Sequence, residues 1–159
     1  MRALVTGAAG RIGSGLVAEY PDRYQWRLAD RPGAVFGSDA HETVRFDIAD
    51  LEAFRAACLD VDVVVHLAAD PDPEADFQGS LRYNNITGTW NAFQAAAEAG
   101  CKRVVFASSV HAVGGYPGDV PIQDGWPAAP INTYGASKVW GESLGRVFAH
   151  RHGLSCIAI

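Results

Sequence analysis

The segment TGAAGRIG, at residues 6–13, constrains the fold of this chain more than any other part of the sequence. Its glycines, Gly7, Gly10 and Gly13, recur at intervals of three. An apolar run precedes the segment, and apolar residues recur at helical spacing after it. Glycine is favoured where a backbone turns sharply or is approached closely by other atoms. The segment therefore predicts a strand, a tight turn and a helix in direct succession.

Short apolar runs alternate with longer helical patterns along the chain. Runs such as VVVHLA are apolar throughout, which is typical of parallel strands covered by helices on both faces. We expect strands at 2–6, 25–29, 43–46, 62–68, 103–108 and 154–159, and helices at about 11–20, 50–58, 79–99 and 132–152. This alternation predicts an α/β fold with a Rossmann-type, doubly wound parallel sheet and helices on both faces. The 159 residues suit one domain, residues 1–159.

The glycine-rich turn also suggests a phosphate site. Free N–H groups and the positive dipole end of a helix amino terminus bind phosphate. Gly7 would permit the turn, Gly10 would admit a diphosphate, and Gly13 would let the helix pack on the sheet. Asp30, 20 residues after Gly10, could accept hydrogen bonds from an adenosine ribose and would repel a 2′-phosphate, which favours NAD over NADP. A plain glycine-rich turn and a surface acid are the alternatives.

A second candidate site combines two serines with a Tyr–Lys pair. Tyr134 and Lys138, in YGASK, are four residues apart, so on a helix they share one face. A tyrosine that acts as a base near pH 7 must ionise about three pH units below its usual value, and a neighbouring ammonium supplies energy of that size. With Ser108 or Ser109 holding the reacting oxygen, this set could take a proton from an alcohol while hydride passes to NAD. A solvent-facing Tyr–Lys pair is the alternative.

Taken together, these blocks resemble the extended short-chain dehydrogenases/reductases, the family of NAD-dependent epimerases and dehydratases. TGAAGRIG, LAD, FDIAD, HLAA, NNITGTWN, VVFASSVHAVG and YGASK match that family's blocks in order over essentially the whole chain. The resemblance implies that Ser109 is the catalytic serine, Tyr134 the base, and Lys138 both its activator and a ligand of the nicotinamide ribose. It also implies cofactor contacts at Gly7, Gly10, Arg11, Ile12, Gly13, Asp30, Asp47, Ile48, Leu67, Ala68, Ala69, Asn85, Tyr134 and Lys138.

Within that family, FASSVHAVGGYP and YGASKVWGE are most similar to uronate dehydrogenases and related sugar dehydrogenases. The resemblance implies NAD-dependent oxidation of a sugar or sugar acid, with Ser109, Val110, His111 and Tyr134 at the substrate. A nucleotide-sugar epimerase or dehydratase with tightly held NAD is the alternative on the same fold. An NAD-sensing module and a serine hydrolase that uses Ser109 and His111 are further alternatives.

Two features depart from the family pattern. Asp70, Asp72, Glu74 and Asp76 crowd the loop expected beside the substrate, where they would repel a carboxylate or simply form a solvated face. The chain also stops at Ile159, after the sixth expected strand, whereas members of the family continue. We therefore expect the C-terminal substrate portion to be missing from this chain.

Composition and charge argue against several other classes. A formal net charge of −5 without a basic cluster argues against nucleic acid and membrane surfaces as partners. No apolar run approaches the ~20 residues that span a bilayer, and we expect a cytoplasmic protein. Cys58, Cys101 and Cys156 lack metal-ligand spacing, so we expect free thiols and no metal site.

The family pattern implies a homodimer or higher homo-oligomer, formed through the helices at 79–99 and 132–152. The aromatic residues Trp90, Phe93, Trp140 and Phe148 on these helices could serve either that contact or the core.

Overall fold

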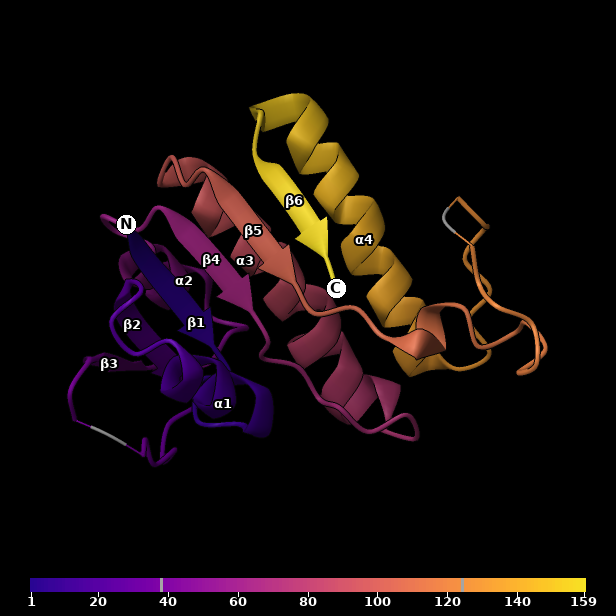
Figure 1. Ribbon diagram of the computed structural model, residues 1–159, viewed down its shortest axis with the longest axis horizontal. Coiled ribbons are helices and arrows are strands. Elements are labelled where there is room, and N and C mark those ends of the chain that lie inside the picture. The colour runs from indigo at the N-terminus through magenta and orange to yellow at the C-terminus, as the bar shows by residue number, and fades with distance from the viewer. Residues whose placement is uncertain (38, 124) are drawn as a thin grey trace.

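The computed structural model describes residues 1–37, 39–123 and 125–159. Its strands, β1 (Arg2–Thr6), β2 (Gln25–Asp30), β3 (Glu42–Arg45), β4 (Val63–His66), β5 (Arg103–Phe106) and β6 (Ser155–Ala158), form one sheet. The order is β3-β2-β1-β4-β5-β6, and every neighbouring pair is parallel. Figure 1 shows the common direction of β1, β4, β5 and β6. The predicted doubly wound α/β fold of the Rossmann type is confirmed. The strand order reverses direction between β1 and β4. Sheets of this type have a ligand-binding crevice at their carboxyl edge at this point.

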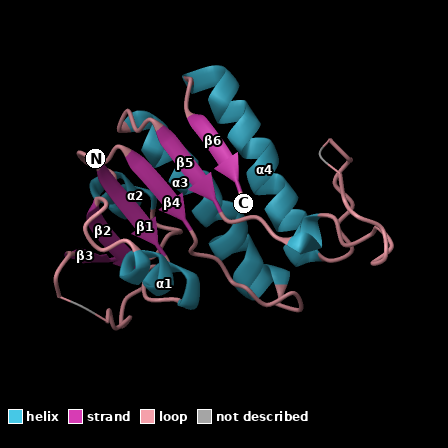
Figure 2. Ribbon diagram, in the orientation of Figure 1, coloured by secondary structure: helices cyan, strands magenta, loops and turns pink. Residues whose placement is uncertain are grey.

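The helices lie on both faces of the sheet, as Figure 2 shows. Helix α1 (Arg11–Glu19) covers one face, and α2 (Leu51–Ala57), α3 (Gly88–Glu98) and α4 (Thr133–His152) cover the other. Right-handed crossovers require this division, because the chain moves toward one sheet edge from β1 to β3 and toward the opposite edge from β4 to β6.

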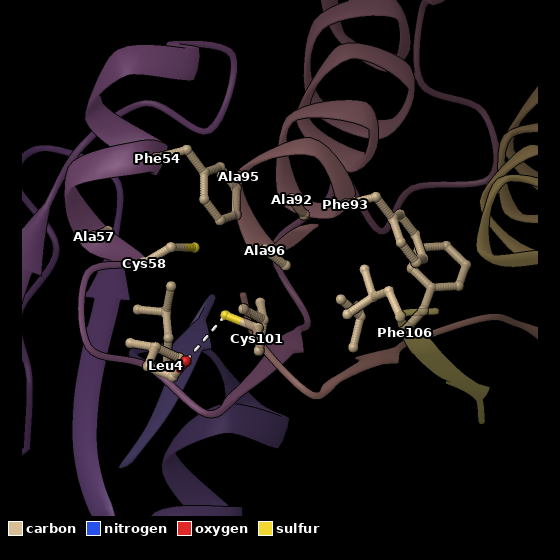
Figure 3. Packing of buried hydrophobic residues seen from close by; sticks show 14 of the residues in the cluster. Leu4, Phe54, Ala57, Cys58, Ala92, Phe93, Ala95, Ala96, Cys101 and Phe106 are labelled. Atoms are coloured by element: carbon tan, nitrogen blue, oxygen red, sulfur yellow. Dashed lines mark hydrogen bonds between the residues drawn. The ribbon is translucent and has the colours of Figure 1, made fainter. Parts of the chain in front are cut away.

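Two apolar clusters fill the space between the sheet and its helices. Alternate residues of β1 point to opposite faces, so Leu4 joins one cluster and Val5 the other. Figure 3 shows the larger cluster, in which Phe54 of α2 and Phe93 of α3 pack beside Leu4 and Phe106. These side chains fix α2 and α3 against the sheet. They thereby also fix the position of the loops that connect these helices to the carboxyl edge of the sheet.

The segment expected as one helix at 79–99 has two parts. It begins as a π-helical stretch, η1 (Phe77–Thr87), and continues as α3. The wider turns of a π-helix carry an additional residue per turn, which rotates the side chains relative to an α-helix, and such turns occur often at functional sites. Apolar periodicity does not distinguish the two helix types at this length.

The glycine- and proline-rich stretch at 109–131 is joined to itself by backbone hydrogen bonds near its two ends. A single 3-10 turn, η2 (Val110–Ala112), follows β5. The N–H of Ala129 donates to the carbonyl of Ala112 at 2.9 Å, and the N–H of Gly115 donates to the carbonyl of Ala129 at 2.7 Å. The end of the loop therefore returns to η2, immediately before α4 begins.

The aromatic residues on α3 and α4 divide between core and surface. Phe93 and Phe148 are buried in the larger cluster, whereas Trp90 and Trp140 are partly exposed. The phenylalanines therefore form core and the tryptophans lie on the surface, and the oligomer contact stays a prediction.

The three cysteines are free thiols, as expected. Cys58 and Cys101 are buried, and Cys156 is half-buried. Among the described residues, no group of three or more His, Cys, Asp or Glu side chains could hold a metal ion. Within the same residues, none of the helices combines the length and the apolar character that a membrane crossing requires.

Candidate active site

The glycine turn joins β1 to α1 in the way that its spacing predicts. Gly7 has a φ of +70°, a conformation that favours glycine. A Cβ on Gly13 would lie 2.5 Å from the carbonyl oxygen of Gly7, so only glycine lets α1 start this close to the turn. Gly10 is the N-cap residue of α1 and contributes no side chain to the cap. Backbone N–H groups at this helix end are therefore free to face a ligand.

A groove of about 970 Å³ opens above this turn, at the carboxyl edge of β1, β2 and β4. Its walls come from the glycine turn, from the loops that follow β2 and β3, and from the chain that leaves β4. All the predicted cofactor positions except Asn85, Tyr134 and Lys138 line it: Gly7, Gly10, Arg11, Ile12, Gly13, Asp30, Asp47, Ile48, Leu67, Ala68 and Ala69.

The carboxylate of Asp30 is held in place by two backbone donors. The N–H of Ala9, in the glycine turn, donates to one oxygen at 2.9 Å, and the N–H of Arg31 donates to the other at 2.8 Å. The acid therefore lies between the turn and the loop that follows β2, with lone pairs remaining on both oxygens. A carboxylate in this position can accept hydrogen bonds from the hydroxyl groups of a ligand in the groove.

Asp47 and Ile48 form the far wall of the groove. Asp47 accepts a hydrogen bond from the N–H of Ala49 at 2.9 Å, which closes a short turn after β3. The carbonyl oxygen of Ile48 accepts from the side-chain amide of Asn91, in α3, at 2.8 Å. The main chain of this wall is thus fixed from within the fold, and the Ile48 side chain offers it an apolar surface.

Tyr134 and Lys138 lie together in the first turns of α4, as their spacing predicts. Both are buried, with 8% and 5% of their surface exposed. The Lys138 Nζ donates to the carbonyl oxygen of Ala107 at 2.9 Å and lies 5.4 Å from the centre of the Tyr134 ring. Burial lowers the pKa of Lys138 to about 8. The ammonium is therefore held beside the phenol at the carboxyl end of β5, where little water screens its charge.

The two serines that follow β5 have different partners. The Ser108 hydroxyl donates to the carboxylate of Glu142, in α4. The Ser109 hydroxyl oxygen accepts from the N–H of His111 at 3.2 Å, which leaves its own proton to be donated elsewhere. This difference favours Ser109 over Ser108 as the residue that holds a reacting oxygen.

The two other predicted substrate residues differ in their relation to Tyr134. The His111 ring lies edge-on to the Tyr134 ring, with 5.5 Å between their centres. Val110, by contrast, is 80% exposed. The structure thus brings His111 and Tyr134 into contact and leaves Val110 at the surface of η2.

Asn85 connects the groove to α4 without lining the groove. Its side-chain oxygen accepts from the N–H of Asp70 at 2.8 Å, and its amide nitrogen lies within hydrogen-bonding distance of the Asp70 carbonyl and the Ser137 hydroxyl. Asn84, the preceding residue, lines the groove. In η1, adjacent asparagines therefore serve the two halves of the site.

The acidic loop after β4 is organised by its own backbone. Asp70 accepts from the N–H of Asp72 at 3.0 Å, and Asp72 accepts from the N–H of Glu74 at 2.9 Å. Asp76 caps η1 by accepting from the N–H of Gly79. Asp70, Asp72 and Asp76 thus stabilise consecutive turns, a structural role that charge alone did not reveal.

Several residues of the groove escaped the sequence reasoning. The loop after β2 contributes Pro32, Gly33, Ala34 and Val35, and the chain after β4 contributes Pro71. Each follows a strand that ends at the carboxyl edge of the sheet. Their position after a strand was the signal that could have identified them, since ligands of open α/β sheets bind at this edge.

Comparison with known proteins agrees with this geometry. Residues 3–159 match the model of the NAD dependent epimerase/dehydratase family. An NAD-dependent glucose-6-phosphate dehydrogenase of Haloferax volcanii is 38% identical over an alignment of 176 positions, which covers 98% of this chain and 66% of that protein.

Two solved structures show the same arrangement of elements. A mutant uronate dehydrogenase from Agrobacterium tumefaciens, complexed with NAD, matches with a TM-score of 0.90 and 35% identity over 98% of this chain and 58% of that one. The UDP-glucose 4-epimerase of Thermus thermophilus, also complexed with NAD, matches with a TM-score of 0.86 and 29% identity over 99% of this chain and 54% of that one. The chain spans between about half and two thirds of the length of these relatives. It belongs to the NAD dependent epimerase/dehydratase family.

Proposed function

We propose that this chain binds NAD in the groove and that Ser109, Tyr134 and Lys138 oxidise an alcohol of a sugar or sugar acid. A bound NAD would supply the hydride acceptor for the carbon that carries the hydroxyl. The hydroxyl proton passes to the Tyr134 oxygen, and the C–O bond becomes a carbonyl. Ser109 donates a hydrogen bond to the reacting oxygen, and the Lys138 ammonium stabilises the negative charge on Tyr134 before proton transfer.

The residues of the groove fit a dinucleotide. A Cβ on Gly13 would fill the turn, and a Cβ on Gly7 would lie 2.9 Å from the backbone nitrogen of Ala68. Backbone without side chains therefore surrounds the place where a diphosphate would lie. Asp30 is positioned to bind ribose hydroxyls, and Ile48 offers an apolar wall for adenine. The absence of side chains at these glycines, directly before α1, is the observation that carries the proposal for NAD.

The environment of Lys138 supports its role beside Tyr134. With a pKa of about 8, the amine is mostly protonated at pH 7. Its bond to the Ala107 carbonyl fixes the charge on the side of the helix that Tyr134 occupies. An ammonium in so dry a place acts on a neighbouring phenolate more strongly than it would in water.

A nucleotide-sugar epimerase is the second candidate, because UDP-glucose 4-epimerases match nearly the whole chain at similar identity. Such an enzyme oxidises its sugar and then reduces it again without releasing NADH. Net formation of NADH therefore separates the two functions. The homo-oligomer that the family pattern implies and the cytoplasmic location expected from the sequence stay predictions.

The test measures NAD binding by calorimetry and NADH formation by absorbance, with glucuronate, galacturonate, glucose 6-phosphate and UDP-glucose as substrates. We expect NADH from a free sugar acid or sugar and none from UDP-glucose. Tyr134→Phe should lower kcat by about 10²–10⁴-fold, because it removes the proton acceptor, and should lower NAD affinity far less. Tyr20→Phe, at an exposed tyrosine after α1, is the matched control. Unchanged turnover in Tyr134→Phe would refute the assignment of the base.

A further inference from the structure

Asn132 lies between the end of the long loop and the first turn of α4, and it contacts both parts of the site. Its side-chain oxygen accepts from the N–H of Gly135 at 2.7 Å, which makes it the N-cap of the helix that carries Tyr134 and Lys138. Its side-chain nitrogen lies 3.1 Å from Nδ1 of His111, 21 residues earlier in the chain.

These two contacts settle which proton lies between Asn132 and His111. The oxygen must face the Gly135 N–H, because the reversed amide would place two donors against each other there. The Asn132 nitrogen is therefore the group that faces His111, and an amide nitrogen can only donate. Nδ1 of His111 must then accept, so the ring carries its proton on Nε2.

The surrounding backbone holds both residues in this arrangement. A Cβ on Gly135 would lie 2.3 Å from the carbonyl oxygen of His111, so η2 and α4 approach each other as closely as backbones can. The His111 N–H donates to the Ser109 oxygen, and the His111 ring rests against Tyr134. Of the hydrogen bonds in the described part of the chain, the imidazole takes part only in the one with Asn132.

We propose that Asn132 is a positioning residue that fixes His111 as the tautomer protonated on Nε2. The imidazole is then a neutral hydrogen-bond donor beside Tyr134, suited to an oxygen acceptor such as a sugar hydroxyl or a carboxylate. The tautomer follows from the geometry alone, whereas the identity of that acceptor rests on the proposed function.

The test compares the nitrogen resonances of the His111 ring in the full 159-residue chain labelled with ¹⁵N, assigned by their loss in His111→Gln. A protonated ring nitrogen resonates well upfield of a bare one, so the two tautomers differ in which nitrogen is shifted. Asn132→Asp keeps the cap, because Asp caps helices as well as Asn does, but places an oxygen opposite Nδ1. Asn132→Ser also keeps a capping oxygen and removes the donor to His111.

We expect the Nε2–H tautomer in the wild type, the Nδ1–H tautomer in Asn132→Asp, and a mixture in Asn132→Ser. A wild type with the proton on Nδ1, or a tautomer that is the same in the wild type and Asn132→Asp, overturns the proposal whether or not the chain oxidises a sugar. If the chain is active, Asn132→Asp should raise KM on the order of five-fold with little change in kcat. The variant loses the hydrogen bond that Nε2 of His111 donates to the substrate, and this bond serves binding. If the tautomers behave as expected and no sugar is oxidised, the proposed function fails and the role of Asn132 stands.

Discussion

Replacing Lys138 by methionine should stabilise the fold near neutral pH, and this advantage should disappear as the pH rises. Lys138 is 5% exposed, and desolvation lowers its pKa from 10.5 in the unfolded chain to about 8. Between these values the unfolded chain holds a proton that the folded chain has released, so the free energy of unfolding of the wild type rises with pH through this window. Below about pH 8 the full penalty for the buried ammonium is present.

The size of the effect follows from the two pKa values. At about 1.36 kcal/mol per pH unit, their difference corresponds to roughly 3 kcal/mol. The methionine variant also loses the hydrogen bond from Nζ to the Ala107 carbonyl, which contributes about 1 kcal/mol. Its net advantage at pH 7 should therefore be about 2 kcal/mol. The change in the difference between the two proteins, from about pH 7 to about pH 10.5, should still be about 3 kcal/mol.

The assay is urea unfolding followed by circular dichroism at several pH values in this range. Because only the difference between wild type and variant is used, the titration of groups that do not interact with Lys138 cancels. Lys102→Met is the control, since exposed Lys102 pairs with Asp62 and its pKa is raised. The stabilising contribution of the Lys102–Asp62 ion pair is lost as the pH rises through the folded pKa of Lys102. The difference in stability between wild type and Lys102→Met should therefore change little with pH, and in the opposite direction. A wild-type–Lys138→Met difference that changes by less than about 1 kcal/mol would refute the reasoning.

Two further predictions concern the turn and the core. In Gly13→Ala the new Cβ would lie 2.5 Å from the Gly7 carbonyl oxygen, so we expect α1 to shift and calorimetry to show NAD affinity reduced at least about ten-fold. Gly15→Ala, whose new Cβ would have no heavy atom within 4 Å, should bind NAD normally. Equal losses of affinity in the two variants would contradict the role of Gly13. His66 is buried, and desolvation lowers its pKa to about 3, so stability should fall as the pH drops from about 6.5 toward 3. Unfolding midpoints of His66→Leu should lack this decline, and parallel losses in the two proteins would argue against it.

Local sequence determined the elements whose residues interact with near neighbours in the chain. The turn at Gly7 and the close packing at Gly13 involve atoms a few residues apart, and their spacing predicted both. Tyr134 and Lys138 share a helix face because of their separation by four residues. Continuous apolar runs predicted the parallel sheet, because a strand buried on both faces needs no polar side.

Tertiary structure decided the contacts that join distant segments. Whether Asn85 faces the groove or α4 depends on the π-helical turns of η1, which the sequence pattern did not reveal. The bond between Asn132 and His111, and the choice of Glu142 as partner for Ser108, depend on how α4 lies against the end of β5. A hydrogen bond forms only when donor and acceptor lie within a few tenths of an ångström of the right separation. That precision arises from the packing of whole helices on the sheet, whereas sequence periodicity records only which face of each element is apolar.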